Sequence, residues 1–87
     1  MSHARPQLHW HPSSHSCRRA VATVRHLGAA VEEVVVDLPA GAHKSPDYLG
    51  LNPNGMVPLL IAGDLRLWES TAIARYLVER EQSDLLP

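Results

Sequence analysis

The segment from Leu51 to Leu60 constrains the fold more than any other stretch, because turn and proline signals are concentrated in it. Asn52-Pro53 and Asn54-Gly55 are turn dipeptides, since proline pre-sets one torsion angle while asparagine and glycine tolerate positive φ. Val57-Pro58 then opens a short apolar strand, where the proline has no N–H to donate to a sheet and holds Val57 in an extended conformation. We therefore predict a cis bond before Pro58 and a Val57 backbone that is free to pair with a peptide-like ligand. An ordinary turn with a trans proline is the alternative.

The composition indicates one small domain and argues against several classes of function. With 87 residues and no phenylalanine, the chain can bury a single core built from valine, leucine, isoleucine and alanine. A net charge of −1, with acids and bases interspersed, argues against a nucleic-acid-binding protein, which would carry a basic stripe. We find neither an apolar run of about 18 residues for a membrane span nor an apolar secretory-signal region. The single cysteine, Cys17, fits a reducing compartment, so we expect a cytoplasmic protein.

The spacing of apolar residues predicts alternating strands and helices. Apolar residues recur at helical spacing between Cys17 and Leu27, and Gly28 suits the position just after a helix. Ser45-Pro46 is a strong helix start, and Gly63-Asp64 between two apolar runs indicates a hairpin. The expected order is strand 8–11, a helix ending at 27, strand 31–36, loop 38–44, a short helix from 46, strands 58–62 and 65–68, and helix 70–81. Because a strand-helix-strand order implies a parallel crossover, we predict an α/β fold of the thioredoxin type, βαβ-α-ββα, with a four-stranded mixed sheet.

Glu69 and Ser70 stand where the last strand turns into the last helix, a position that can bind an anion. The first N–H groups of a helix are unpaired and carry the positive end of its dipole, which suits a carboxylate. The Ser70 hydroxyl adds a donor, and Glu69 can accept from an amino group. Together they would satisfy the carboxylate and the ammonium of an amino acid, whereas simple capping of the helix by Ser70 is the alternative.

Two further groups of polar residues are candidates for binding or chemistry. His43-Lys44, just before the short helix, offers two donors or cations, or is simply a solvated pair. Ser13, Ser14 and Ser16 cluster at the start of the first helix, where the dipole and free N–H groups stabilise a thiolate and a hydroxyl can donate to a bound sulfur. Helix capping is the alternative for each serine.

The histidines and the cysteine near the N-terminus raise the question of a metal site. His9, His11, His15 and Cys17 lie close together in the sequence, but no second cysteine pair or acidic partner is nearby. Structural zinc sites show a clearer spacing, so we predict no metal. Cys17 falls on the apolar side of the first helix, and we interpret it as a small core residue.

In this order and spacing, the motifs resemble the glutathione-binding N-terminal domain of the cytosolic glutathione transferases over residues 7–87. The residues that carry the resemblance are Asn52 to Pro58, Gly63-Asp64, Leu67 to Ser70, Ala72-Ile73 and Tyr76-Leu77. His11 to Ser14 ahead of Arg18-Arg19, and the pair His43-Lys44, resemble the phi class in particular. The resemblance implies a thioredoxin-like domain at residues 1–82, with residues 83–87 as the start of a linker to a helical domain.

The resemblance also implies a role for each candidate residue. Ser14 matches the serine that donates to the glutathione sulfur, which makes it the expected catalytic residue, with Ser13 as the alternative. The remaining matches are glutathione-binding positions: His43 and Lys44 near the glycine carboxylate, Met56 and Val57 beside the cysteinyl unit, the cis proline Pro58, and Glu69 and Ser70 on the γ-glutamyl group.

The function that the resemblance implies is that of a glutathione transferase, seen here as its glutathione-binding half. Such a detoxification enzyme activates the thiol of glutathione, its co-substrate, for conjugation to a small electrophile, and needs no metal. The resemblance allows a homodimer of the full-length protein, although Asn54 stands where phi-class proteins often carry an aromatic residue that inserts into the other subunit. One alternative is a thiol-disulfide or deglutathionylating enzyme of the same superfamily, which needs a cysteine at position 13 or 14. The other is a transferase-like domain used only for binding or assembly.

Overall fold

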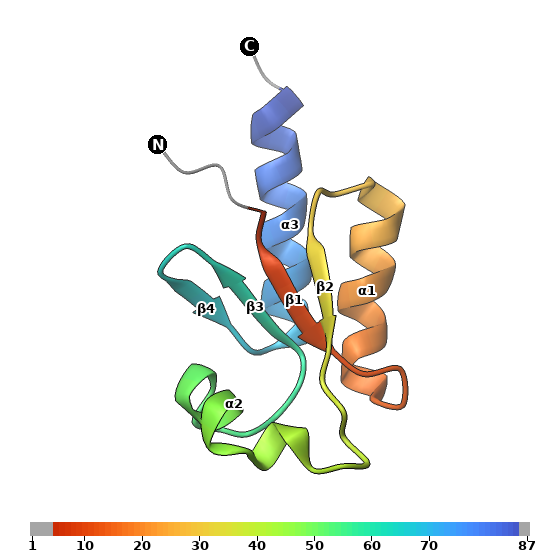
Figure 1. The fold of residues 1–87 in the computed structure, drawn as a ribbon. Coiled ribbons are helices and arrows are strands. Elements are labelled where there is room, and N and C mark those ends of the chain that lie inside the picture. The colour runs from red at the N-terminus through yellow and green to blue at the C-terminus, as the bar shows by residue number, and fades with distance from the viewer. Residues whose placement is uncertain (1–4, 86–87) are drawn as a thin grey trace.

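The computed structural model describes residues 5–85, with side chains up to residue 81, as one sheet covered by helices on both faces (Figure 1). The strands are β1 (Gln7–Trp10), β2 (Glu32–Val35), β3 (Leu59–Ala62) and β4 (Leu65–Leu67). The helices are α1 (His15–Leu27), α2 (Pro46–Leu51) and α3 (Ser70–Leu85), and the 3-10 helix η1 (Ala42–Lys44) precedes α2. The strand order is β2-β1-β3-β4, with β1 and β2 parallel and the other neighbours antiparallel. The predicted four-stranded mixed sheet and thioredoxin-like fold are confirmed.

The first strand lies one residue earlier than the predicted strand 8–11. His11 leaves the sheet because its carbonyl accepts a hydrogen bond from the Ser14 N–H at 3.1 Å, which starts the turn into α1. The helix ends agree with the prediction: Gly28 has a left-handed φ of 64° after α1, and the Ser45 hydroxyl caps α2 by accepting from the Tyr48 N–H at 3.2 Å.

Two predictions about the helices were wrong. The predicted loop at 38–44 contains η1, whose short turn a propensity argument does not detect. Helix α3 continues to Leu85 instead of ending at residue 81, because no glycine or proline interrupts the chain before Pro87. The start of the predicted linker at 83–87 is therefore helical as far as Leu85, and residues 86–87 lie outside the described residues.

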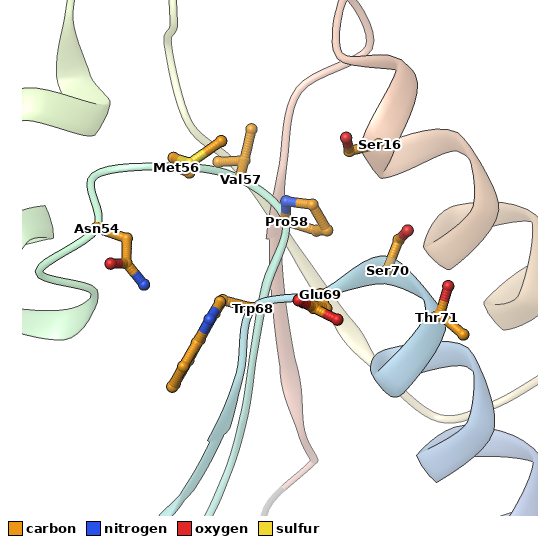
Figure 2. Close-up of a pocket in the computed structure, with 9 residues that line it drawn as sticks. All are labelled: Ser16, Asn54, Met56, Val57, Pro58, Trp68, Glu69, Ser70 and Thr71. Carbon is orange, nitrogen blue, oxygen red and sulfur yellow. The ribbon is translucent and has the colours of Figure 1, made fainter.

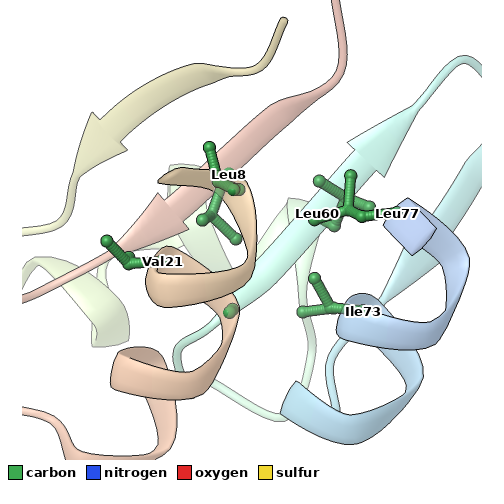
Figure 3. Packing of buried hydrophobic residues seen from close by; sticks show 7 residues of the cluster. Leu8, Val21, Leu60, Ile73 and Leu77 are labelled. Carbon is green, nitrogen blue, oxygen red and sulfur yellow. The ribbon is translucent and has the colours of Figure 1, made fainter. Parts of the chain in front are cut away.

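The main core lies between the sheet and the helices α1 and α3 (Figure 3). Leu8 of β1 and Leu60 of β3 are fully buried and belong to one cluster with Val21 of α1. Ile73 and Leu77, four residues apart on one side of α3, close the same cluster. Burying each of these side chains contributes about 1.5–3 kcal/mol, so this layer stabilises the domain.

A second apolar cluster joins α2 to the opposite face of the sheet. Leu59 follows the strand alternation, pointing away from the side that Leu60 faces, and packs with Tyr48 and Val57. Cys17 belongs to this cluster and is 1% exposed, which confirms it as a core residue. The segment before β3 is therefore anchored between the sheet and α2.

His9 of β1 is a buried titratable side chain on the α2 face of the sheet. It is 7% exposed and packs against Tyr48, with the ring centroids 6.0 Å apart. Burial lowers the pKa of His9 below its ordinary value of 6.5, and the Glu32 carboxylate opposes this effect. When the pH falls below the pKa that His9 has in the unfolded chain, the His9 imidazole binds a proton in the unfolded state but not in the folded state. Stability is therefore retained above pH 6.5 and lost as the pH falls below that value.

We expect the melting temperature to fall when the pH is lowered from about 7.5 to about 5.5, and to fall less in the His9→Gln variant. The variant removes the imidazole whose protonation opposes folding, so the pH dependence decreases. This holds even if the substitution also lowers the melting temperature at both pH values. His26→Gln, at an exposed position on α1, is the matched control and should keep the wild-type pH dependence. Thermal melts at the two pH values measure this, and equal pH dependences in His9→Gln and the wild type would contradict the assignment.

Candidate functional site

A pocket of about 330 Å³ lies where three segments that are distant in sequence meet (Figure 2). The segments are the start of α1, the loop before β3 and the junction of β4 with α3. The lining residues are Ser16, Asn54, Met56, Val57, Pro58, Trp68, Glu69, Ser70 and Thr71. Five of these were predicted from the sequence, namely Met56, Val57, Pro58, Glu69 and Ser70. The structure therefore brings the two strongest candidate motifs together in one pocket.

The loop before β3 presents the backbone of Val57 at one wall of this pocket. The bond between Val57 and Pro58 is cis, as predicted, and both residues are buried. Gly55 has a φ of 62°, and a Cβ at this position would lie 2.9 Å from Lys44 Nζ and 3.2 Å from the His43 carbonyl oxygen. The turn thus needs glycine both for its left-handed conformation and for the close approach of η1.

The N-terminus of α3 forms the opposite wall. The first helical hydrogen bond runs from the Ile73 N–H to the Glu69 carbonyl at 2.9 Å, so the N–H groups of Ser70 and Thr71 have no acceptor within the helix. Ser70, Thr71 and the Glu69 side chain all lie on the pocket side (Figure 2). Arg19 of α1 donates to the Thr71 hydroxyl at 2.8 Å and adds a positive charge beside this helix start. The wall can therefore bind a carboxylate, with Glu69 available for an ammonium.

The serines at the start of α1 face different sides of the helix. Ser14 occupies the N-cap position with φ −89° and ψ 120°, and its side chain makes no capping hydrogen bond. It lines a neighbouring cavity of about 310 Å³ together with Cys17 and Arg18. Ser16 lines the main pocket instead, because residues two apart on a helix point about 200° apart. The structure therefore places the Ser14 side chain next to the pocket and not among its lining residues.

Ser13, the alternative to Ser14, is engaged locally. Its N–H donates to His11 Nδ1 at 3.0 Å, and its hydroxyl lies 2.8 Å from the same nitrogen. Ser13 is exposed, whereas Ser14 is half-buried with a hydroxyl not used in capping. These contacts favour Ser14 as the serine that can donate to a ligand.

The fold places His43 and Lys44 next to the loop before β3, but neither residue lines the pocket. Both belong to η1, and Lys44 Nζ lies against Gly55 at the end of the loop. His43 is half-buried, and its Nδ1 is buried without a hydrogen-bond partner among the described residues. Lys44 Nζ therefore lies beside the turn that leads into Met56 and Val57, and His43 approaches the same turn through its carbonyl oxygen.

A family model for the glutathione S-transferase N-terminal domain matches residues 7–79. The chain belongs to the glutathione S-transferase family. Glutathione S-transferase 3 of Zea mays is 44% identical over 84 residues, covering 93% of this chain and 38% of the relative. A glutathione S-transferase of Silene vulgaris is 41% identical over 71 residues, covering 82% of this chain and 33% of the relative. The curated relatives are plant phi-class transferases, as the sequence motifs indicated.

Solved glutathione transferases share the fold. A transferase homologue from Drosophila mojavensis, solved with bound glutathione, superposes with a TM-score of 0.84 at 32% identity, covering 88% of this chain and 35% of that chain. The present glutathione S-transferase domain thus spans between 33% and 38% of the length of the relatives named here.

Four lining residues of this glutathione S-transferase domain were not among the predicted glutathione-binding positions: Ser16, Asn54, Trp68 and Thr71. Trp68 and Thr71 flank the Glu69-Ser70 motif, so the motif could have been extended by one residue on each side. Asn54 was interpreted as a turn residue and as a position near a subunit interface, not as part of the pocket. Ser16 was grouped with the other serines at the start of α1, but only the helix geometry shows that it faces the pocket.

Among the described residues, no group of three histidine, cysteine or acidic side chains is placed to hold a metal ion. His9 instead packs in the core and His11 contacts Ser13. In the part of the chain that the structure describes, no helix is both long and apolar enough to cross a membrane.

Proposed function

We propose that this chain is the glutathione-binding half of a glutathione transferase and prepares the glutathione thiol for attack on an electrophile. The observation that carries the proposal is the pocket that joins the Met56-Val57-Pro58 loop to the Glu69-Ser70 helix start. A tripeptide needs partners for two charged ends and for its peptide groups. This pocket offers a helix N-terminus, a carboxylate and a free stretch of backbone within one space of about 330 Å³.

In this proposal each part of glutathione has its own partner. The γ-glutamyl carboxylate binds the N–H groups and hydroxyl at the start of α3, and its ammonium binds Glu69. The cysteinyl unit pairs with the backbone of Val57, and the glycine carboxylate reaches the side chains of η1, His43 and Lys44. The exposed cationic ammonium of Lys44 suits such a carboxylate because it can move toward it.

The thiol is activated in this proposal by the start of α1. Ser14 is at the N-cap, where the helix dipole stabilises negative charge, and its hydroxyl is not used as a cap. A hydrogen bond from this hydroxyl would stabilise the thiolate, which is the nucleophilic form of sulfur. Cys17 is 1% exposed and therefore not available for thiol-disulfide exchange, which argues against a deglutathionylating enzyme.

Conjugation also needs a binding site for the electrophile, which we place in a helical domain following this chain. The described residues provide the glutathione pocket, and the relatives are about three times as long as the matched part. We therefore infer that this chain alone binds glutathione but turns over poorly, since positioning of the second reactant accounts for much of such a rate. A cytoplasmic location and a homodimer of the full-length protein are part of the same proposal.

The Glu69→Gln and Ser70→Ala variants are each expected to weaken glutathione binding by about 1–3 kcal/mol without unfolding the domain. Glu69→Gln removes the charge that would pair with the ammonium, and Ser70→Ala removes a donor to the carboxylate. Isothermal titration calorimetry with glutathione measures both, and circular dichroism verifies the fold.

Glu79→Gln is the matched control for Glu69→Gln, since it makes the same change within α3, the helix that Glu69 precedes, at an exposed site paired with Arg75. It should leave glutathione binding unchanged. Retention on immobilised glutathione separates a transferase from a binding or assembly domain that has lost the ligand. If the wild-type chain is not retained, or if both pocket variants bind as tightly as the wild type, the proposed function is wrong.

A further inference from the structure

The carbonyl group of Met56 receives two hydrogen bonds from side chains of the α2 region. Tyr48 on α2 donates its hydroxyl to this oxygen, and Asn52, the residue after α2, donates its Nδ2 group at 3.0 Å. Met56 itself has a side chain that is 61% exposed, so its backbone is held from the inside while its side chain is free. Two donors on one carbonyl oxygen saturate its two lone pairs.

Both donors are themselves held in one orientation. Tyr48 is 5% exposed and Asn52 is 1% exposed, so neither can turn to water. Asn52 Oδ1 accepts from the Asn54 N–H at 3.2 Å, which leaves Nδ2 as the end of the amide that faces Met56. Burial raises the pKa of Tyr48 above its ordinary value of 10.0, so the hydroxyl keeps its proton and remains a donor.

Fixing the Met56 carbonyl also fixes the N–H of Val57. The two groups belong to one peptide unit, which is planar and trans, so they point in opposite directions. Because the carbonyl points toward Tyr48 and Asn52, the Val57 N–H points away from α2, on the side of the pocket that Val57 lines. This N–H makes no hydrogen bond within the described residues.

We propose that Tyr48 and Asn52 are positioning residues, which orient the Val57 N–H for the cysteinyl backbone of glutathione through their shared hydrogen bonds to the Met56 carbonyl. The inference rests on the proposed function, because it assumes that glutathione pairs with Val57. It adds to the binding machinery two residues that do not line the pocket and that act on the ligand only through the Met56-Val57 peptide group. It also connects α2 to the binding loop, so that the helix and the loop move as one unit.

The test is the Tyr48→Phe variant, which removes one of the two donors and keeps the buried ring. Tyr76→Phe makes the same change on α3, in the other apolar cluster, and is the matched control. Glutathione affinity should fall about three- to tenfold in Tyr48→Phe and remain unchanged in Tyr76→Phe. Calorimetry with glutathione measures this change.

A second probe distinguishes positioning from a general loss of structure. The compound γ-glutamylmethylamide has the carboxylate and ammonium that bind at α3 but lacks the cysteinyl backbone, and its weak binding can be followed by chemical-shift titration. Its affinity should be the same in Tyr48→Phe and the wild type.

The possible outcomes are distinguishable. If the wild-type chain does not bind glutathione, the proposed function fails and this inference fails with it. If the wild type binds glutathione and Tyr48→Phe binds it equally well, only the inference is overturned. Equal loss of both ligands in Tyr48→Phe would also overturn it, since that result indicates general destabilisation.

Discussion

Replacing Ser14 by alanine is expected to raise the pH at which bound glutathione loses its thiol proton by about two units. A free thiol ionises near pH ~8.5, and about 2.7 kcal/mol of preferential thiolate stabilisation corresponds to that shift. Ser14 can supply this stabilisation because it stands at the N-cap of α1 with a hydroxyl not committed to capping. Glutathione affinity should change little, since the carboxylates bind elsewhere. An ultraviolet titration of the bound thiolate measures the shift.

The neighbouring serines provide matched controls for this prediction. Ser13 is hydrogen-bonded to His11, so Ser13→Ala should leave the titration curve in place. Ser16 lines the pocket on the side of Ser70 and Thr71, where it can contact the γ-glutamyl end, so Ser16→Ala should affect affinity more than thiolate formation. If Ser16→Ala moves the titration curve and Ser14→Ala does not, the activating residue is Ser16.

The Leu60→Ala variant is expected to lower the free energy of unfolding by about 2–5 kcal/mol. Leu60 is fully buried on β3 between Leu8 and the helix α3, so truncation removes transfer energy and leaves a cavity. For a domain of 87 residues this is a large part of a total of roughly 4–13 kcal/mol. Urea denaturation followed by circular dichroism measures the change.

Leu65→Ala is the matched control, since it removes the same atoms from the adjacent strand β4 at a position that is 41% exposed. It should cost less than about 1 kcal/mol. A similar loss in both variants would mean that the main core is not centred on Leu60.

The sequence predicted best those parts of the fold that depend on local backbone chemistry. The turn at Asn54-Gly55, the cis bond before Pro58, the Ser45 cap and the Gly28 helix end follow from proline, glycine and capping rules, and all are present. The length of α3 could not be predicted in this way, because its last turn carries no strong signal for or against a helix. The η1 turn was missed for the same reason.

The site was predicted in part, and the difference again has a physical cause. Glu69 and Ser70 were found because a strand-to-helix junction is visible as a local pattern. The positioning role that we propose for Tyr48 and Asn52 could not be predicted, because it depends on a contact between the α2 region and the Met56 carbonyl that spacing does not reveal. Ser16 was likewise missed because the facing of a side chain at a helix start depends on where the helix begins.

The origin of the pocket in three separate segments ties ligand binding to cooperative folding. The segments at residues 16, 54–58 and 68–71 meet only when the sheet and both large helices are assembled, so no isolated hairpin or helix can form the site. A ligand that binds only the folded chain shifts the folding equilibrium by mass action, by about 2.7 kcal/mol when its concentration is 100 times the dissociation constant. Glutathione would then protect even a variant with a weakened core from proteolysis. Ligand binding and core packing would both shift the same equilibrium, the one between the folded and the unfolded chain.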